Sequence, residues 1–221
     1  MARVRATSYR CIETEDDIRE GIRSLRRRCK VMRHVHERAG EPPLRRREAG
    51  FEGLARIVVA QQVSVASATA IWARFETAVS PLAAERLLLA TDEDLRGAGL
   101  SGPKMRTLRA ISQAVADGLD LARLDALRDD EVHAALTAVS GIGPWTADVF
   151  LLFCLGRADA FAAGDLALQI AAQHAFKLDE RPDQRMLAEL AERWRPWRGV
   201  AARLLWAYYR TVKAANSGMP V

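Results

Sequence analysis

The stretch Leu136-Thr-Ala-Val-Ser-Gly-Ile-Gly-Pro-Trp-Thr-Ala147 decides how the rest of the chain is interpreted. Two glycines, Gly141 and Gly143, flank one apolar residue, and Pro144 follows where a missing N–H suits the first turn of a helix. This pattern predicts a helix, a tight hairpin and a second helix over residues 136–155. Glycine allows close approach of the backbone, and the N–H groups of a helix start bind anions. We therefore expect a phosphate site at this hairpin.

A second stretch, Asp159-Ala-Phe-Ala-Ala-Gly-Asp165, follows the apolar helix of the hairpin. Asp165 stands at the predicted start of another helix, where an aspartate after a glycine is ordinarily an N-cap. On the local sequence alone the cap is the favoured interpretation. The order of the segments nevertheless puts a carboxylate one helix away from the predicted phosphate site.

Composition and charge set broad limits. The chain has 221 residues, 33 Lys plus Arg and 28 Asp plus Glu, which gives a formal net charge of +5. This balance favours a polyanionic partner only modestly, although an excess of arginine over lysine suits phosphate geometry. No apolar run approaches the length of a transmembrane helix, and we expect no leader segment. We expect a soluble cytoplasmic protein.

The three cysteines, Cys11, Cys29 and Cys154, are odd in number and widely separated. Neither a Cys-x-x-Cys pair nor a histidine spacing supports a zinc site. Since Cys29 and Cys154 lie in apolar helical patterns, we interpret the cysteines as buried free thiols of a reducing cytosol.

Apolar residues recur at intervals of three and four along most of the chain, and no segment alternates with a period of two. The chain is therefore predicted to be all-α, with about ten helices. The first helix, which we expect to run as far as Gly40, has a charged face opposite its apolar one. That face is a solvated surface or a contact for a polyanionic partner, and the sequence leaves the choice open. Its basic residues are Arg23, Arg26, Arg27, Lys30 and Arg33.

Two adjacent glutamines, Gln61 and Gln62, interrupt the apolar pattern in Ala60-Gln-Gln-Val-Ser64. As structure alone, they form a polar turn between two helices, and Ser64 caps the second helix. Neighbouring glutamines between apolar residues also suit a segment that meets a polar ligand.

These motifs together resemble the helix-hairpin-helix GPD superfamily of DNA base-excision glycosylases, and within it the DNA-3-methyladenine glycosylase II branch. The resemblance covers about residues 45–210 and includes Trp194-Arg-Pro-Trp-Arg198. It implies one glycosylase domain over residues 1–221 with two helical lobes, the first helix sharing a lobe with the last. We expect neither the extra β-domain nor the iron–sulfur cluster of some members of the superfamily.

The resemblance implies that Asp165 is the catalytic carboxylate, which outweighs the local preference for a simple cap. A carboxylate near C1′ of the deoxyribose stabilises the positive charge that develops as the base leaves, and it orients the attacking water. Asp159 is expected to anchor its loop. Asp148 is expected to make a polar contact inside the second hairpin helix.

Trp145 occupies the position of the nucleophilic lysine in the bifunctional branches, so the resemblance implies a monofunctional enzyme without lyase activity. Packing at a helix start is the alternative role for Trp145. Tryptophan faces favour electron-deficient alkylated purines such as 3-methyladenine and 7-methylguanine. Two positions that are aromatic in well-known members are aliphatic here, which leaves the range of lesions open. The implied base pocket comprises Trp145, Trp206, Val149 and Leu166.

The resemblance further implies that Gln61 and Gln62 fill the space left by a flipped base. The N–H groups of Gly141, Gly143 and Thr146 would hold a DNA phosphate. No cofactor is expected beyond a structural Na⁺ or K⁺ on the carbonyls of Thr137, Val139 and Ile142.

The expected partner is damaged double-stranded DNA. No membrane contact is expected, and the protein is expected to be a monomer. A glycosylase for an oxidised or deaminated base and a non-catalytic DNA-binding protein are the alternatives.

Overall fold

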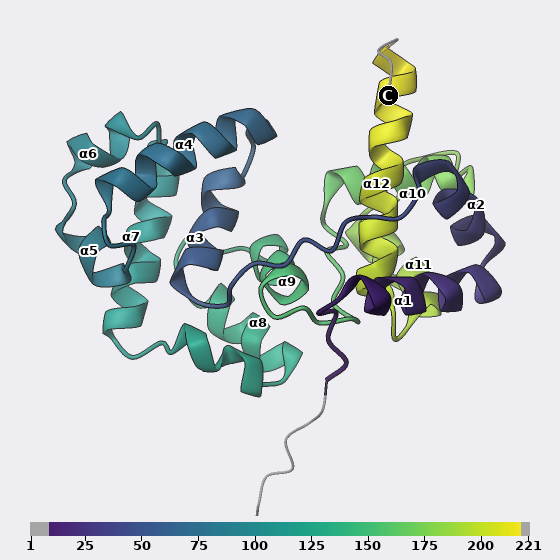
Figure 1. Ribbon diagram of the computed structural model, residues 1–221, viewed down its shortest axis with the longest axis horizontal. Helices are drawn as coiled ribbons and strands as arrows, with labels where there is room; N and C mark the ends of the chain where they lie inside the picture. Colours follow the sequence, from purple (N-terminus) through teal and green to yellow (C-terminus); the bar gives the residue numbers. More distant parts are fainter. Residues whose placement is uncertain (1–8, 218–221) are drawn as a thin grey trace, which may run out of the picture. The chain divides into compact units, whose positions relative to one another are not determined.

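The structure, a computed structural model, describes residues 9–217 and is helical throughout that range (Figure 1). These residues form twelve α-helices, ten of them at least eight residues long, and two short 3-10 helices. The described part of the chain has no β-strand, and its one isolated β-bridge is antiparallel, between Cys11 and Arg157. The predicted all-α class and the expected number of longer helices are confirmed.

The chain divides into two compact units, each described here by itself. The first, which we call the hairpin unit, is Arg47–Leu155. Its central helix is α3, which contacts α4, α7 and α9, while α8 packs along α9. The helices of this unit are α3 (Phe51–Ala60), α4 (Val65–Ala78), α5 (Ala84–Leu89), α6 (Asp92–Gly97), α7 (Gly102–Ala116), a 3-10 helix (Leu121–Ala126), α8 (Asp129–Thr137) and α9 (Pro144–Phe153).

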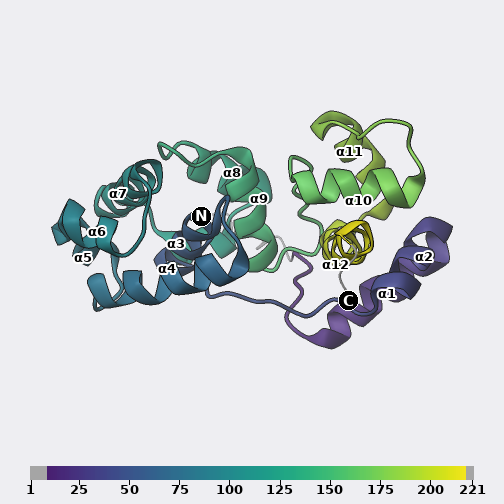
Figure 2. The ribbon, with the colours of Figure 1, turned by 90° about the horizontal axis from the view of Figure 1, so that it is seen from above.

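The second unit, which we call the aspartate unit, comprises residues 9–46 and 156–217 of the described chain. Figure 2 shows its longest helix, α12, end-on between α10 on one side and the α1–α2 pair on the other. The N-terminal and C-terminal helices thus share a unit, as the resemblance implies. The helices are α1 (Glu15–Arg28), α2 (Lys30–Ala39), α10 (Leu166–Phe176), α11 (Gln184–Ala191), a 3-10 helix (Glu192–Trp194) and α12 (Arg198–Ser217).

Apolar stripes and caps explain where these helices form. Thr14 and Asp17 make a capping box before α1, with the Asp17 N–H donating to Thr14 Oγ1 at 3.3 Å and the Thr14 N–H to Asp17 Oδ2 at 2.8 Å. In α3, nearly every apolar side chain is buried, because three helices surround it. None of the helices in residues 9–217 combines the length and apolar character needed to cross a bilayer.

The prediction of one continuous N-terminal helix is wrong. The helix breaks at Cys29, whose backbone is extended with φ −141° and ψ 112°, so that α1 ends and α2 begins at the same residue. The break redirects the chain and lets Met32 and Val35 of α2 become fully buried in a unit where α2 packs on α12 and α10. The expected burial of all three cysteines is also wrong, since Cys11 and Cys29 are only half-buried and Cys154 alone is buried.

Candidate active site

The predicted hairpin lies between α8 and α9, and its two glycines serve different needs. Gly141 has φ +85°, and a Cβ atom there would overlap the side chain of Thr107, approaching its Cβ to 3.0 Å. Gly143, the N-cap of α9, has φ −94°, and a Cβ atom there would meet no other part of residues 9–217 within 4 Å. The fold therefore requires glycine at position 141 but not at 143. The open space at Gly143 leaves room for a ligand to approach the backbone.

Thr146 fastens the hairpin to the end of α3. Its side chain is 2% exposed, and its hydroxyl oxygen accepts a hydrogen bond from Gln61 Nε2 at 2.9 Å. The Thr146 N–H donates to the carbonyl of Gly143 at 3.0 Å, a contact within the first turn of α9. The phosphate role predicted for this N–H therefore stays a prediction, and the role that the structure shows for Thr146 is to join two elements.

The two adjacent glutamines are placed differently from each other. Gln61 is the C-cap of α3, half-buried, and its amide is directed at Thr146. Gln62 is exposed and has φ +54°, a left-handed conformation that is uncommon for a residue other than glycine. Such conformations persist where the surroundings hold them, and they concentrate at functional sites. Of the two glutamines, Gln62 is the one that the hairpin unit presents to solvent.

Lys104, which the sequence analysis did not single out, supports the same loop. Its Nζ donates to the carbonyl of Val59 at 2.8 Å, in the last turn of α3, and burial lowers the pKa of this lysine. A cation at the C-terminal end of a helix stabilises its unpaired carbonyls. Because Lys104 and Val59 are 45 positions apart, no local pattern marks the contact.

The carbonyls expected to hold a monovalent cation lie where α8 gives way to the hairpin. Thr137 is the last residue of α8, so its carbonyl belongs to the group that has no partner within the helix. Val139 accepts the N–H of Ile142 at 3.0 Å, and a carbonyl retains a second lone pair. Carbonyl oxygens at helix ends are of the type that binds alkali cations, and the Na⁺ or K⁺ expected here stays a prediction.

In the aspartate unit, Asp165 combines the two roles that the sequence weighed against each other. It is the N-cap of α10, and its Oδ1 accepts the N–H of Leu168 at 3.0 Å. The same oxygen accepts the indole N–H of Trp206, on α12, at 3.0 Å. Asp165 is half-buried, and both donors hold the same carboxylate oxygen. Leu166 beside it is 54% exposed, unusually high for leucine in this fold.

The four predicted pocket residues form two pairs, one in each unit. In the hairpin unit, Trp145 and Val149 are four apart on α9 and so lie on one face of that helix. Trp145 is half-buried, whereas Val149 is 6% exposed and offers little surface to a base. In the aspartate unit, Leu166 and Trp206 lie at the start of α10 and on α12.

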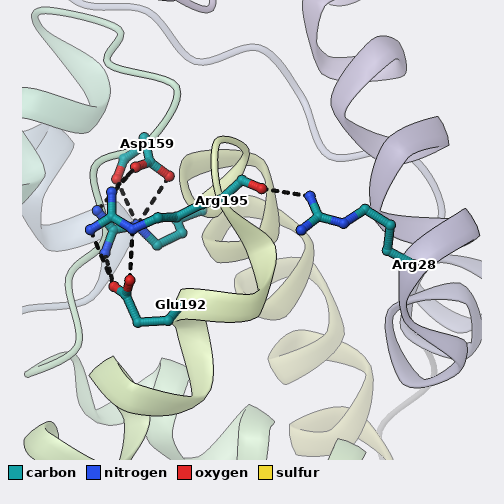
Figure 3. Close-up of polar contacts among 5 residues, drawn as sticks. Arg28, Asp159, Glu192 and Arg195 are labelled. Carbon is teal, nitrogen blue, oxygen red and sulfur yellow. Dashed lines mark hydrogen bonds and ion pairs between the residues drawn. The ribbon is translucent and has the colours of Figure 1, made fainter.

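Asp159 anchors its loop, as expected (Figure 3). Arg198 donates from Nε to Asp159 Oδ1 at 3.0 Å and also to the Asp159 carbonyl, and Arg195 donates to Oδ2. Glu192 binds both guanidinium groups at 2.7 Å, and Arg28 reaches the carbonyl of Arg195. Trp194-Arg-Pro-Trp-Arg198 therefore supplies a double arginine clamp on Asp159. No residue type within the loop itself signals this clamp.

The remaining acidic candidate, Asp148, lies in α9 of the hairpin unit. Its Oδ1 is 3.8 Å from His133 Nε2 on α8, and its side chain is 19% exposed. This is the polar contact within the hairpin helices that the sequence predicted. Across residues 9–217, no three His, Cys, Asp or Glu side chains gather in a way that would hold a metal ion.

A glycine hairpin between two helices, followed by an aspartate that caps the next helix, gives the chain the architecture of a helix-hairpin-helix protein. The model of the HhH-GPD superfamily of base excision DNA repair proteins matches residues 55–196. The chain belongs to this superfamily.

Individual relatives agree with the family. The chain is 31% identical to DNA-3-methyladenine glycosylase 1 of Schizosaccharomyces pombe over 77% of its own length and 76% of that protein. It resembles the S. pombe 3-methyladenine DNA glycosylase solved with abasic DNA, with a TM-score of 0.78 at 27% identity, covering 85% of this chain and 95% of that one. A Bacillus halodurans DNA-3-methyladenine glycosidase gives a TM-score of 0.74 at 31% identity, covering 94% of each chain.

Proposed function

We propose that the protein is a monofunctional DNA glycosylase that hydrolyses the N-glycosidic bond of alkylated purines of the 3-methyladenine and 7-methylguanine type. The observation that carries the proposal is the placement of Asp165, whose carboxylate is fixed by Trp206 and by the start of α10. Similarity to relatives named as 3-methyladenine glycosylases supports the substrate class.

In the proposed reaction, Asp165 acts on the sugar rather than on the base. As the C1′–N bond lengthens, positive charge develops on the deoxyribose, and a fixed carboxylate stabilises it more strongly than mobile water does. Asp165 also accepts the proton of the water that attacks C1′. The products are the free base and an abasic site.

The hairpin unit is proposed to hold the DNA while the damaged nucleotide leaves the helix. The backbone at Gly141, Gly143 and Thr146 binds a phosphate, and Gln62 enters the vacated stack. Gln61, because it is tied to Thr146, fixes the position of this loop instead of entering the DNA. A Na⁺ or K⁺ on Thr137, Val139 and Ile142 would add positive charge next to that phosphate.

The absence of lyase activity is proposed from the residue at position 145. A lyase of this superfamily attacks C1′ with a lysine amine, and tryptophan has no such group. Trp145 and Trp206 instead supply faces on which an electron-deficient, alkylated purine stacks better than a normal base. The weaker glycosidic bond of such a purine adds to the selection.

The test measures base release by mass spectrometry from duplex DNA that carries alkylated, oxidised or deaminated bases. Wild-type protein should release 3-methyladenine and 7-methylguanine, and borohydride should trap no covalent adduct. Release of oxidised or deaminated bases alone would replace the proposed substrate class. Tight binding to abasic DNA without release of any base would favour the alternative, a non-catalytic DNA-binding protein. A trapped adduct would refute the monofunctional mechanism.

A further inference from the structure

The elbow between α1 and α2 in the aspartate unit concentrates positive charge around an open hollow. Arginines from the last turns of α1 and from the start of α2 line this hollow, with one carboxylate on its rim. The catalytic proposal uses none of them. We call this group the arginine hollow, and it consists of Arg23, Arg26, Arg27, Arg33 and Glu37.

Only part of this charge is neutralised within the protein. Arg26 donates to Glu37 Oε1 at 3.2 Å, and Arg33 donates to the Arg26 carbonyl at 3.2 Å. Arg23 and Arg27 are exposed, and their side chains have no hydrogen bond or ion pair to any group in residues 9–217. Four guanidinium groups therefore face one carboxylate.

A histidine lies beside Arg26, one of the arginines of the hollow. Arg26 Nη1 lies 2.9 Å from His36 Nδ1, and burial, followed by the charge of Arg26, lowers the pKa of His36 despite Glu37 and Glu41. A neutral imidazole accepts a hydrogen bond from the guanidinium at Nδ1. Like charges held close together repel each other, and an anion placed among them relieves the repulsion.

We propose that the arginine hollow binds phosphate groups of the DNA duplex beyond the damaged nucleotide. Membership of a DNA repair family supplies the polyanion, and guanidinium groups bind phosphate oxygens through two parallel hydrogen bonds. Arg23 and Arg27 are one turn apart on the same face of α1, so they meet an extended row of charges. The inference rests on DNA binding, but it does not depend on the glycosylase chemistry.

The experiment compares how binding falls with salt for wild type and for the triple variant Arg23→Ala, Arg27→Ala and Arg33→Ala. The probes are two DNA duplexes with a stable abasic-site analogue at the centre. The first is short and extends little beyond the analogue, and the second is longer. Each phosphate contact contributes about 0.9 to the slope of log affinity against log salt. On the long duplex, we expect the variant to reduce the steepness of this slope by about 2 to 3. On the short duplex, we expect the slope to equal that of wild type.

Two further variants control for charge. Replacing the same three residues with lysine should restore most of the slope. The slope depends on how many positive charges contact phosphates and only weakly on the geometry of each contact. Replacing Arg96, Arg123 and Arg185 with alanine removes equal charge from sites where the side chains are 67%, 87% and 87% exposed. An unchanged slope on the long duplex would overturn the proposal. So would an equal fall on both duplexes or in this second triple variant.

Discussion

Asp159 and Asp165 are six residues apart in the same unit, yet their surroundings differ in kind. Asp159 is bound by the guanidinium groups of Arg195 and Arg198, and its side chain is 25% exposed. Asp165 accepts from two uncharged donors, the indole of Trp206 and the amide of Leu168. A carboxylate paired with two arginines has its charge satisfied within the protein. Two neutral N–H groups instead fix the orientation of the Asp165 carboxylate.

Substitution of Asp165 should have the largest effect. Asp165→Asn removes the charge but keeps a good N-cap for α10, so the fold should survive while base release falls about 10³-fold. Single-turnover release of 3-methyladenine, with a thermal melt of the same sample, separates these effects. Comparable release by the variant and wild type would remove Asp165 from the mechanism.

Substitution of Asp159 should produce the opposite result. Asp159→Asn leaves Arg195 and Arg198 with Glu192 alone, and breaking this partly exposed pair should cost about 2 kcal/mol of unfolding free energy. Base release per folded molecule should stay near that of wild type. Urea unfolding with an active-site titration measures both quantities. A fall in turnover without any loss of stability would show that the two aspartates are not separate in function.

The orientation of Asp165 is tested at Trp206. Trp206→Phe keeps an aromatic face but removes the N–H that donates to Asp165, and one hydrogen bond to a charged group corresponds to about tenfold in kcat/KM. Trp194→Phe is a matched control, because the buried Trp194 Nε1 has no hydrogen-bond partner in the described residues. The control should lower stability alone. Equal turnover in both variants would show that the indole N–H does not position the carboxylate.

The smallest expected effect is on how the free energy of unfolding depends on pH at the arginine clamp of Asp159. The hydrogen bond from Arg195, with the charges of Arg198 and Arg195, holds the pKa of Glu192 below its usual 4.5. The folded state therefore binds this proton less readily than the unfolded state, so the contribution is present above pH 4.5 and is lost as the pH falls through the lower, folded pKa. Glu192→Gln should make the free energy of unfolding less dependent on pH below 4.5. A curve identical to that of wild type would mean that the clamp does not rely on Glu192.

The hairpin and the cap at Asp165 could be predicted from sequence, because each is encoded by neighbouring residues. The arginines that hold Asp159 in its loop are 36 and 39 positions away, so that part of its role could not. The partner of Gln61 could not, since Thr146 is 85 positions away. The same is true of Lys104 and Val59. Such contacts follow from how the helices of one unit pack, and helical periodicity does not specify that packing.

The break at Cys29 shows a second limit. The apolar spacing continues through this residue, so the pattern favours one long helix. What ends α1 there is the burial that α2 gains against α12 and α10, which is a tertiary effect. The arginine hollow exists because of this break, and so it was visible in the sequence only as a basic helix face.

The difference between Gly141 and Gly143 has a consequence for how this protein changes under selection. Alanine at 141 is opposed by the chain itself, through the positive φ and the contact with Thr107. The Cβ of an alanine at 143 meets no other part of the described chain within 4 Å. A population selected for folding alone would keep glycine at 141 and lose it at 143. A lineage that retains both glycines is also under selection for the ligand that occupies the space at Gly143.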